Sequence, residues 1–580
     1  MQTAEPPARQ QPVKVSVVVP THNTGGTVLT GLRSFLAQSM PRPDFEVIYV
    51  DDGSDDDTVA LLENEIAERG AGSTVRVVRA EHSGWPGRPR NIGTDLARGE
   101  FVHYVDDDDR LAPEALERLY ARARETGADI VIGRTAGHGR QAPRALFEKP
   151  MTSCDLRTDT ALLASMTVHK LFRRAFLREH RLRFPEGKVR LEDHMFTLRA
   201  FLLTDRVATV HDYTCYHWVR HTDGKHNVSY RTIEPGPYID SIRRLLAILD
   251  APDTCVPPGR HRNRLVAKWY GKKALDRISG KRLLDQPEDR RAEWVEAVGA
   301  LASELPPEAD TALPTRLRIV AALARHGDRA LLEEQARFEA GVVHLPRVVS
   351  TRWREGQLTV RCSTSLIRRS GRGPGRRAVP LAFRRDGDRR VLRLPPRVAA
   401  VQAAAARADF SKAIRRSNVR GQLHHREGGT VLNLPTTWRV IEVPAGERAR
   451  REGAVVRRLR SAGRRLARSV PRPLADTTAE LCARLAARLP GARRGREDRC
   501  TLRFEAEFTV DPATADHGRQ LAAGTWDLRF QLGCGGWRTS QPLPGHSIEV
   551  PEPAERTEEP PPHQVRPPRQ RQEPRVTART

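Results

Sequence analysis

Four consecutive aspartates follow an apolar run in HYVDDDDRL, residues 103–111. Side chains alternate between the two faces of a strand, so Asp106 and Asp108 point to the same side. Carboxylates this close together repel one another and attract a cation. A hard divalent ion, held by one or two carboxylates and by substrate phosphate oxygens, would satisfy them. In the structural alternative, Asp109 begins a turn and caps a helix that starts near Pro113.

Two polar segments upstream also suit a ligand. DDGSDD, residues 51–56, offers an aspartate that could accept hydrogen bonds from a nucleobase or a ribose. Alternatively, its residues form a turn, with an acid in the first turn of the next helix. PGRPRN, residues 86–91, places Arg88 and Arg90 at a helix start, where backbone N–H groups already favour phosphate. The alternative for this segment is a surface turn.

The elements that must position these side chains alternate along the first 135 residues. Between the apolar runs, helical spacing appears at 26–39, 56–69, 89–98 and 112–126. The apolar runs that predict strands are 13–20, 45–52, 75–80, 100–107 and 128–133. Such an alternation predicts a parallel sheet covered on both faces, with ligands bound beyond the carboxyl ends of its strands. THN, DDGSDD, EHSGWPGRPRN and DDDD follow successive strands, so these loops converge on one edge.

The ordered set VSVVVPTHN, VDDGSDDDT and SGWPGRPRNIGTDLARGEFVHYVDDDDRL resembles the family 2 glycosyltransferases, over residues 13 to about 230. The resemblance implies an α/β GT-A (Rossmann-like) catalytic domain and a D-x-D motif formed by Asp106 and Asp108. Asp108 would be the direct ligand of Mn²⁺ or Mg²⁺. The family usually carries a small or hydroxyl residue at the position of Asp107, so which carboxylates bind stays open.

The same resemblance implies a nucleotide-sugar site. Pro20, Thr21 and Asn23 would line the nucleotide pocket, Asp51 or Asp52 would hold the base, and Arg90 would approach the diphosphate. The predicted nucleotide-sugar site consists of Pro20, Thr21, Asn23, Asp51, Asp52, Arg88, Arg90, Asp106 and Arg220.

The segment LEDHMF, residues 191–196, matches the acid pair at which the family places its catalytic base. Asp193 would take the proton of the acceptor hydroxyl, with Glu192 beside it. A single base without a covalent step implies inversion at the anomeric carbon. The alternative is that two acids simply occupy the first turn of the helix that continues as MFTLRAFLL.

A histidine-rich segment follows at 211–230 and includes Tyr216 and Trp218. Related enzymes bring a late His or Arg over the diphosphate and the metal, and His217 and Arg220 fit this role best, with His217 as a metal ligand. A structural role stays open for each histidine of the segment. Trp85 and Trp218 either stack on an acceptor sugar or belong to the core.

At 580 residues the chain needs several domains. Helical patterns run from 233 to 340, and short strands with a period of two follow from 341 to 550, as in a β-sandwich. A basic insertion occupies about 447–498. The sequence thus predicts a disordered N-terminal segment at 1–12, a catalytic domain at 13–232, a helical linker domain at 233–340, a β-sandwich region at 341–550 and a disordered tail at 551–580.

The basic insertion begins with an arginine-rich stretch at 447–470, which either binds anionic lipids or polyanionic chains or is a solvated insertion. The formal net charge of +26, mostly from arginine, favours anionic polymers, nucleotides or a membrane surface as partners, although biased codon usage is an equal alternative. We expect no specific nucleic acid.

Seven scattered cysteines without a CxxC pair argue against a zinc ribbon or a disulfide framework. Neither a signal peptide nor an apolar run of membrane-spanning length is present. These features predict a cytoplasmic protein, with peripheral contact at the inner face of the cell membrane through residues 447–470.

The length and layout most resemble wall-teichoic-acid glycosyltransferases, which carry a GT-A domain, a helical linker and C-terminal immunoglobulin-like modules that can mediate oligomerisation. We therefore expect an inverting, metal-dependent transferase that moves a sugar from a UDP-sugar to a hydroxyl of a cell-envelope glycopolymer, and homo-oligomers through the C-terminal region. The alternatives are transfer to a lipid phosphate or to a growing polysaccharide, or a non-catalytic anionic-polymer-binding protein on the same scaffold.

Overall fold

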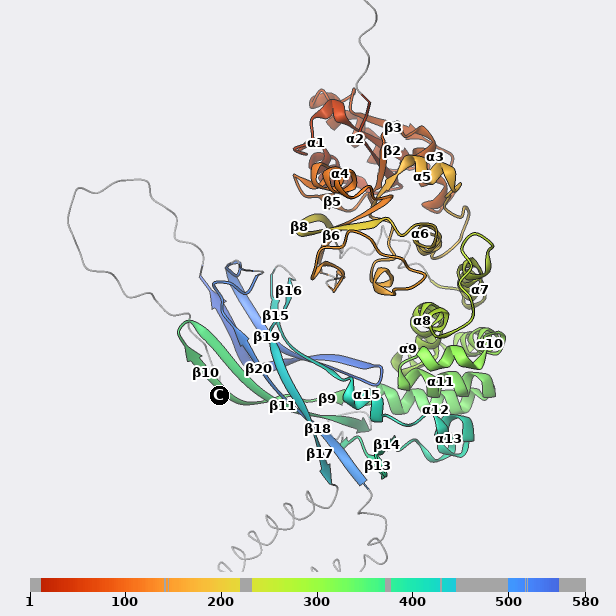
Figure 1. Cartoon of the computed structure of the whole chain (residues 1–580), viewed down its shortest axis with the longest axis vertical. Helices are drawn as coiled ribbons and strands as arrows, with labels where there is room; N and C mark the ends of the chain where they lie inside the picture. The colour runs from red at the N-terminus through yellow and green to blue at the C-terminus, as the bar shows by residue number, and fades with distance from the viewer. Residues whose placement is uncertain are drawn as a thin grey trace, which may run out of the picture. The chain divides into compact units, whose positions relative to one another are not determined.

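The computed structural model describes residues 12–139, 142–143, 145–219, 232–370, 377–427, 430–444, 499–516, 518 and 520–551 (Figure 1). These residues form two compact units. The first unit contains the described residues up to Arg277, together with Glu288–Leu313 and Thr430. The second contains Ile278–Pro287 and the remaining residues from Pro314 onward.

The first unit contains an eight-stranded sheet in the order β3-β2-β1-β4-β7-β6-β8-β5. Its strands are β1 (Val15–Thr21), β2 (Phe45–Asp51), β3 (Val75–Arg79), β4 (Phe101–Tyr104), β5 (Arg110–Leu111), β6 (Ile130–His138), β7 (Leu171–Arg173) and β8 (Val207–Val219). The parallel pairing predicted for the first four strands is confirmed, because β1 pairs in parallel with both β2 and β4, and β2 with β3. The sheet as a whole is mixed, since β7 runs antiparallel between β4 and β6. A strand of three residues is too short to show a periodicity, so the sequence pattern did not predict β7.

Helices cover both faces of the sheet, as the continuous apolar strands predicted. On one face, Val17 and Val19 of β1 join a buried cluster with Leu32 and Phe35. On the other face, the α3 residue Gly93 lies so close to Val18 that an added Cβ would come within 2.4 Å of its side chain. The helices around this sheet are α1 (Val28–Leu36), α2 (Thr58–Glu68), α3 (Gly87–Leu96), α4 (Ala115–Thr126), α5 (Arg174–Glu179) and α6 (Glu192–Leu202).

A helical segment follows, as the sequence predicted for residues 233–340. Its helices are α7 (Pro235–Ala247), α8 (Arg260–Trp269), α9 (Gly280–Leu284), α10 (Glu288–Glu304), α11 (Thr315–His326) and α12 (Arg329–Ala340). A π-helical turn, Tyr270–Ala274, continues α8 directly. The division between the two compact units runs through this segment. Within the described part of the chain, every helix is too short or too polar to cross a membrane.

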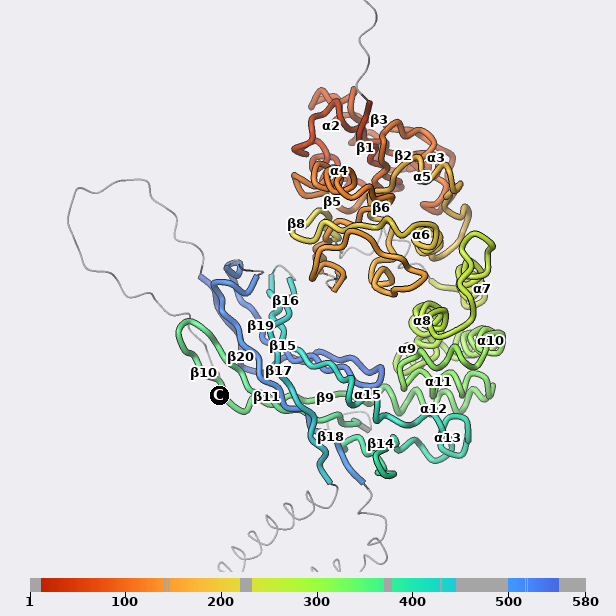
Figure 2. The backbone as a smooth tube through the Cα atoms, viewed as in Figure 1, coloured from red at the N-terminus to blue at the C-terminus, as the bar shows by residue number. Residues whose placement is uncertain are grey.

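The second unit contains two antiparallel sheets, as the period of two predicted. Figure 2 traces the backbone path through this unit. The larger sheet has the order β10-β11-β18-β13-β14, with β9, β12 and β17 attached, and the smaller has the order β16-β15-β19-β20. The two sheets meet at Gly421, where an added Cβ would lie 2.4 Å from the ring of Phe508. Three short helices, α13 (Pro396–Ala400), α14 (Gln402–Ala406) and α15 (Ser411–Arg415), also belong to this unit.

The strands of the larger sheet are β9 (Val342–His344), β10 (Arg347–Arg354), β11 (Gln357–Ser370), β12 (Arg377–Pro380), β13 (Phe383–Asp386), β14 (Arg389–Leu392), β17 (Thr436–Pro444) and β18 (Arg499–Val510). Those of the smaller sheet are β15 (Asn418–His425), β16 (Val431–Asn433), β19 (Gly524–Cys534) and β20 (Trp537–Val550). Because the whole of β17 pairs with residues 500–508 of β18, residues 445–498 are an insertion between two hydrogen-bonded strands.

Several predictions from the sequence fall on residues outside the described part of the chain. These are the role of Arg220, the membrane contact of 447–470 and the disorder predicted for the two termini, except for residues 12 and 551.

Candidate active site

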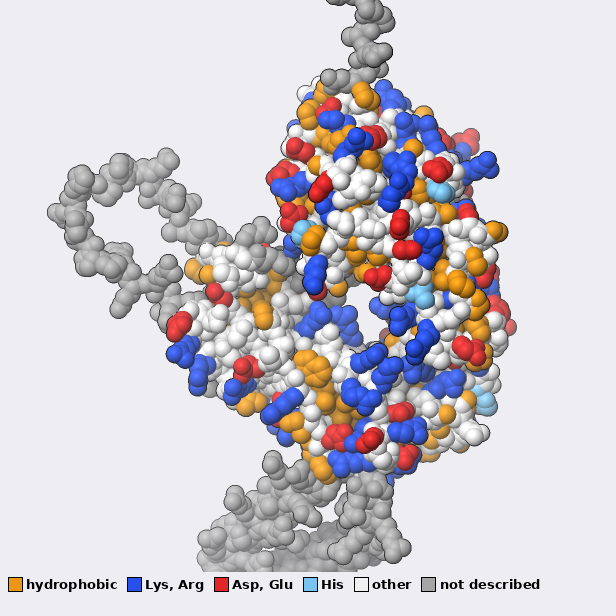
Figure 3. Space-filling model, in the orientation of Figure 1, with side chains coloured by type: hydrophobic (Ala, Val, Ile, Leu, Met, Phe, Trp, Pro, Cys, Tyr) orange, Lys and Arg blue, Asp and Glu red, His pale blue; other side chains and the backbone are white. Residues whose placement is uncertain are grey.

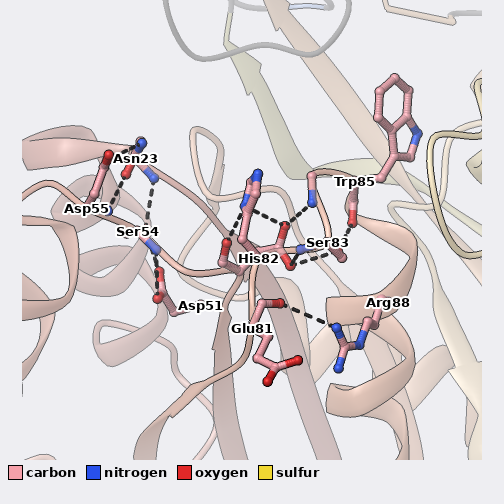
Figure 4. A network of polar contacts seen from close by, with 11 residues as sticks. Asn23, Asp51, Ser54, Asp55, Glu81, His82, Ser83, Trp85 and Arg88 are labelled. Atoms are coloured by element: carbon pink, nitrogen blue, oxygen red, sulfur yellow. Dashed lines mark hydrogen bonds and ion pairs between the residues drawn. The ribbon is translucent and has the colours of Figure 1, made fainter.

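The loops that follow β1 and β2 are tied together by the side chain of Asn23 (Figure 4). Its Nδ2 donates to Asp55 Oδ1 at 2.7 Å, and its Oδ1 accepts from the Asp55 backbone N–H at 3.0 Å. The Asn23 backbone N–H donates to Ser54 Oγ at 2.9 Å. Asn23 has a φ of 51°, a left-handed conformation that asparagine tolerates better than most residues. Asn23 therefore holds the two predicted nucleotide loops together through these hydrogen bonds.

The two predicted base-binding aspartates are buried and organise loops of their own. Asp51 accepts from the backbone N–H of Ser54 at 3.1 Å and from its hydroxyl. Asp52 accepts from the Ser83 N–H at 2.9 Å, from the Ser83 hydroxyl at 2.7 Å and from the Gly84 N–H at 2.8 Å. Asp51 thus holds the loop that ends β2, and Asp52 holds the loop that ends β3, at the carboxyl edge of the sheet. Figure 4 shows Asp51 beside Ser54.

A pair of stacked imidazoles lies beside these loops and was not singled out from the sequence. The rings of His22 and His82 stack with centroids 4.4 Å apart. His82 Nδ1 lies 2.7 Å from the Asp52 backbone oxygen. His22 lies in the motif PTHN and His82 lies in the motif EHSGW. Only the fold brings these two residues together, because they lie 60 positions apart in the sequence.

Asp107 now has a structural explanation. Its carboxylate accepts from the hydroxyl of Thr24, which lies 3.0 Å from the hydroxyl of Thr21. Burial raises the pKa of Asp107, and the hydrogen bonds from the two threonines oppose this increase. Asp107 therefore connects the aspartate run to the loop after β1, where Pro20 and Thr21 end the strand.

Asp109 is not a helix cap, contrary to the structural alternative considered for it. The helix after the run begins at Ala115, and its N-cap residue Glu114 makes no side-chain cap bond. Asp109 instead accepts from the Tyr216 hydroxyl at 2.6 Å and from the Val219 N–H at 2.8 Å. Burial, with the neighbouring charges of Asp108 and Asp106, raises its pKa well above the usual value. The spacing of residues along the chain could not reveal partners on the distant strand β8.

Asp106 is the meeting point of the site's charges. Arg90 Nη2 donates to Asp106 Oδ1 at 2.8 Å, and His169 Nε2 lies 2.8 Å from Asp106 Oδ2. The same guanidinium reaches Glu192, since Arg90 Nη1 donates to Glu192 Oε1 at 3.1 Å. Burial opposes ionisation of Asp106, but His169 and Arg90 outweigh it and hold its pKa below the usual range. Arg90 therefore joins the D-x-D segment directly to the predicted acid pair.

Among the described residues, Asp106, Asp109 and His169 form a group that could hold a metal ion. Each offers one ligand atom, and these atoms all lie within 4.8 Å of one another. Two carboxylates and an imidazole are a suitable donor set for a divalent ion such as Mn²⁺. His169 was missed by the sequence reasoning, and it stacks on Tyr216 with centroids 4.3 Å apart. Asp108 is partly exposed beside this group.

The acid pair lies in the first turn of α6, as one of the two interpretations of LEDHMF predicted. Glu192 is buried, accepts from Arg90 and has the indole Nε1 of Trp85 at 3.4 Å. Burial and the charge of Asp193 raise the pKa of Glu192 to about 7, against the opposing effect of Arg90. Asp193 is partly exposed, and its Oδ1 accepts from the His194 N–H at 2.8 Å. The two acids thus differ in accessibility.

The remaining predicted residues lie apart from these contacts. His217 Nδ1 is 2.9 Å from His138 Nε2, and burial together with Arg110 lowers the pKa of His217 to about 4. Arg88 reaches the Glu81 backbone oxygen at 3.5 Å (Figure 4).

The two tryptophans considered for sugar stacking are placed differently. Trp85 is only 8% exposed, and the Arg190 guanidinium lies 5.6 Å from its ring centre. Trp218 is partly buried and lies edge-on to His169, with centroids 6.2 Å apart. Trp85 is therefore a buried residue beside Glu192 and does not offer an exposed ring for a sugar to stack on.

A mixed sheet covered by helices, with an aspartate run and an arginine at the carboxyl ends of its strands, is the GT-A fold that the sequence predicted. Residues 16–181 match the family model described as glycosyl transferase family 2, and residues 235–336 match the glycosyl transferase TarS linker domain. The N-terminal part of the chain therefore is a family 2 glycosyltransferase domain, and a TarS-type linker domain follows it.

Two curated proteins and one solved structure show what the chain is similar to. A poly(ribitol-phosphate) beta-glucosyltransferase of Bacillus spizizenii is 28% identical over 332 residues, 57% of this chain and 51% of that protein. Poly(ribitol-phosphate) beta-N-acetylglucosaminyltransferase TarS of Staphylococcus aureus is 28% identical over 319 residues, 54% of each chain. The crystal structure of S. aureus TarS 1–349 in complex with UDP-GlcNAc matches at 25% identity with a TM-score of 0.50, over 63% of this chain and 99% of that one. The chain spans about half the length of the curated relatives that it matches.

Proposed function

We propose that this protein transfers a sugar from a UDP-sugar, with inversion, to a hydroxyl group of a polyol-phosphate polymer of the cell envelope. One observation carries the proposal: Arg90 contacts both Asp106 of the aspartate run and Glu192 of the acid pair, at 2.8 Å and 3.1 Å. A donor held at the aspartate run would therefore place its anomeric carbon near the acid pair. A binding scaffold would have no need for four acids and a buried arginine in one cluster.

The donor and the acceptor are inferred from the similar proteins. The similar TarS structure contains UDP-GlcNAc, which supports a UDP-sugar as the donor. The curated relatives are named for poly(ribitol-phosphate), which supports an anionic polyol polymer as the acceptor. Lys and Arg side chains are spread over the visible face of the molecule, in keeping with the net charge of +26 and with an anionic partner (Figure 3).

For the metal, we propose Mn²⁺ or Mg²⁺ held by Asp106 and Asp108, where Asp106 also forms a possible metal-binding group with Asp109 and His169. When bound, such an ion would neutralise negative charge on the departing diphosphate. The cluster fits a cation because its acids outnumber its bases, even though Arg90 and His169 already contact Asp106.

We assign the role of general base to Asp193 rather than to Glu192. The Glu192 carboxylate is buried and occupied by Arg90 and Trp85, so it holds the arginine in place. Asp193 is partly exposed in the same helical turn, where an acceptor hydroxyl could reach it and give up its proton. The oxygen that loses this proton attacks the anomeric carbon as the bond to UDP breaks. One displacement of this kind inverts the configuration at that carbon.

The cellular setting is also a proposal. A UDP-sugar donor supports the cytoplasm as the place of action, and Cys154, Cys215, Cys255, Cys362, Cys500 and Cys534 are all free, which suits a reducing compartment. Peripheral membrane contact through 447–470 and homo-oligomers through the C-terminal region stay predictions.

The test is release of UDP by the full chain from a panel of UDP-sugars, with Mn²⁺ or Mg²⁺, in the presence of poly(ribitol phosphate). We expect release that depends on both one donor and the polymer. Release that requires a lipid phosphate or another polysaccharide instead would replace the proposed acceptor. Polymer binding without release from any donor would favour the non-catalytic alternative.

A further inference from the structure

A hydrogen bond connects the linker domain to the helix that carries the acid pair. Trp269, the last residue of α8, donates from its indole Nε1 to Nδ1 of His194 in α6 at 3.0 Å. The two rings meet edge to face, with centroids 6.3 Å apart. Trp269 is fully buried, and both residues belong to the first compact unit. Trp269 lies within the TarS-type linker match at 235–336, whereas His194 lies before it.

The chemistry of this contact requires a neutral imidazole. Burial, together with the charges of Lys273, Lys268 and Lys170, lowers the pKa of His194 to about 4 against the opposing charge of Asp193. An indole nitrogen can only donate, so the Nδ1 atom that it approaches must be the unprotonated one. The bond therefore fixes His194 in the Nε2–H tautomer and fixes the direction of its ring.

His194 in turn supports its neighbour Asp193. The backbone N–H of His194 donates to Asp193 Oδ1 at 2.8 Å, which selects one orientation of that carboxylate. The turn begins at Leu191, whose φ of 64° places a branched residue in the left-handed region, so other contacts must stabilise this turn. Glu192 is held by Arg90 and Trp85. His194, which follows Asp193 in the sequence, is held by Trp269.

We propose that Trp269 is a positioning residue for the catalytic turn, through which the linker domain sets the orientation of Asp193. The inference rests on the proposed function, since it assumes that Asp193 is the general base. It differs from a general packing role because it depends on one N–H group. Phenylalanine at position 269 would keep an aromatic ring and remove that donor, and the volume lost with the indole is matched by the same substitution at another buried tryptophan.

The test compares Trp269→Phe with Trp294→Phe in the full chain. Trp294, a buried tryptophan of α10, packs edge to face on Tyr238 at 5.8 Å and provides the matched control. For Trp269→Phe we expect kcat to fall about 10-fold, as expected for the loss of one hydrogen bond to a buried acceptor, with the KM for the UDP-sugar unchanged. Trp294→Phe should leave both constants within about twofold. Equal kcat values for the two variants would overturn the proposal.

A substitution of His194 provides a rescue. In His194→Asn, the amide oxygen stands near the position of Nδ1 and can accept from Trp269, whereas His194→Ala offers no acceptor. We expect His194→Asn to retain kcat within about threefold, and His194→Ala to lose about as much as Trp269→Phe. Two equally inactive His194 variants would contradict a role for this bond.

An NMR measurement of the His194 ring nitrogens separates this inference from the proposed function. We expect the Nε2–H tautomer in the wild-type protein and a mixture of tautomers in Trp269→Phe. If the wild-type protein transfers no sugar, the proposed function is wrong, and ring shifts that do not change in Trp269→Phe would overturn the positioning contact independently of turnover.

Discussion

The two parts of the sheet edge, the nucleotide loops and the acid cluster, are held by different kinds of contact. The nucleotide loops after β1 and β2 are fixed by hydrogen bonds of Asn23, Asp51 and Asp52 to hydroxyl, amide and backbone groups about 30 residues away or closer. The acid cluster is fixed by charges, and its members Arg90 and Glu192 lie 102 positions apart. Asn23 Nδ2 and its partner are exposed, whereas Arg90 is 5% exposed.

This difference predicts how each part fails. When a polar contact in an exposed loop is lost, water replaces the missing partner, so its removal has a small effect on stability. A buried charge that loses its partner cannot be solvated, so its removal has a large effect. We therefore expect substitutions in the acid cluster to change turnover or folding strongly, and a substitution of the exposed Asn23 side chain in the nucleotide loops to change them by increments.

Asp193→Asn should have the largest effect on turnover. Asparagine keeps the size and the acceptor oxygen that the His194 N–H uses, but it cannot take a proton. We expect kcat to fall by about 10²- to 10⁴-fold, the range for loss of a general base, while the affinity for UDP measured by calorimetry stays nearly intact. Asp95→Asn, at an exposed acid of α3, is the control. Unchanged turnover would remove Asp193 as the base.

Arg90→Met should have the largest effect on stability. It keeps an unbranched apolar stem but leaves Asp106 and Glu192 without their shared cation. We expect the free energy of unfolding, from urea denaturation at pH 8, to fall by about 3–5 kcal/mol. Arg88→Met, two residues earlier on the same helix, should cost less than about 0.5 kcal/mol, because the hydrogen bond that Arg88 makes within the described part of the chain is a long one, at 3.5 Å, to the Glu81 backbone oxygen. Similar losses for both variants would contradict the contrast between the two parts.

The contrast also explains how much of the site could be predicted from the sequence. The alternation of strands and helices, the aspartate run and the acid pair are local patterns, and they predicted the sheet edge at which Asp106, Arg90 and Glu192 meet. The sequence patterns did not predict the contacts of His169, Tyr216 and Trp269, because each of these residues acts through a partner at least 63 positions away. A short segment such as VHKLFRR has no period that marks His169 or the strand β7 that follows it. The buried polar partners of a site therefore depend on the fold more than its acids do.

The pH dependence of stability tests the burial of Glu192. Its pKa is raised from 4.5 to about 7, so the folded chain binds a proton more tightly than the unfolded chain. Stability contributed by this group is therefore present at low pH and is lost as the pH rises from 4.5 to 7. Glu192→Gln imitates the protonated form. We expect the free energy of unfolding of Glu192→Gln, measured by urea denaturation, to rise relative to that of the wild-type protein across this window, by up to about 1.4 kcal/mol per pH unit.

The control for this profile is Glu179→Gln, whose acid has a side chain 65% exposed. It should not reproduce the gain expected for Glu192→Gln between pH 4.5 and 7. A flat difference for Glu192→Gln would mean that water reaches the carboxylate and that Arg90 compensates its charge fully.

The smallest effects are expected at Asn23, where the side chain and the backbone can be separated. Asn23→Gly removes the two side-chain bonds to Asp55 but suits the φ of 51°. Asn23→Ala removes the same bonds and adds the strain of a Cβ in the left-handed region. We expect the free energy of unfolding to fall by about 0.5–1.5 kcal/mol for glycine and by about 1 kcal/mol more for alanine. If glycine and alanine cost the same, strain does not contribute at this position. If either costs as much as Arg90→Met, the nucleotide loops are as interdependent as the acid cluster, and the contrast between the two parts is wrong.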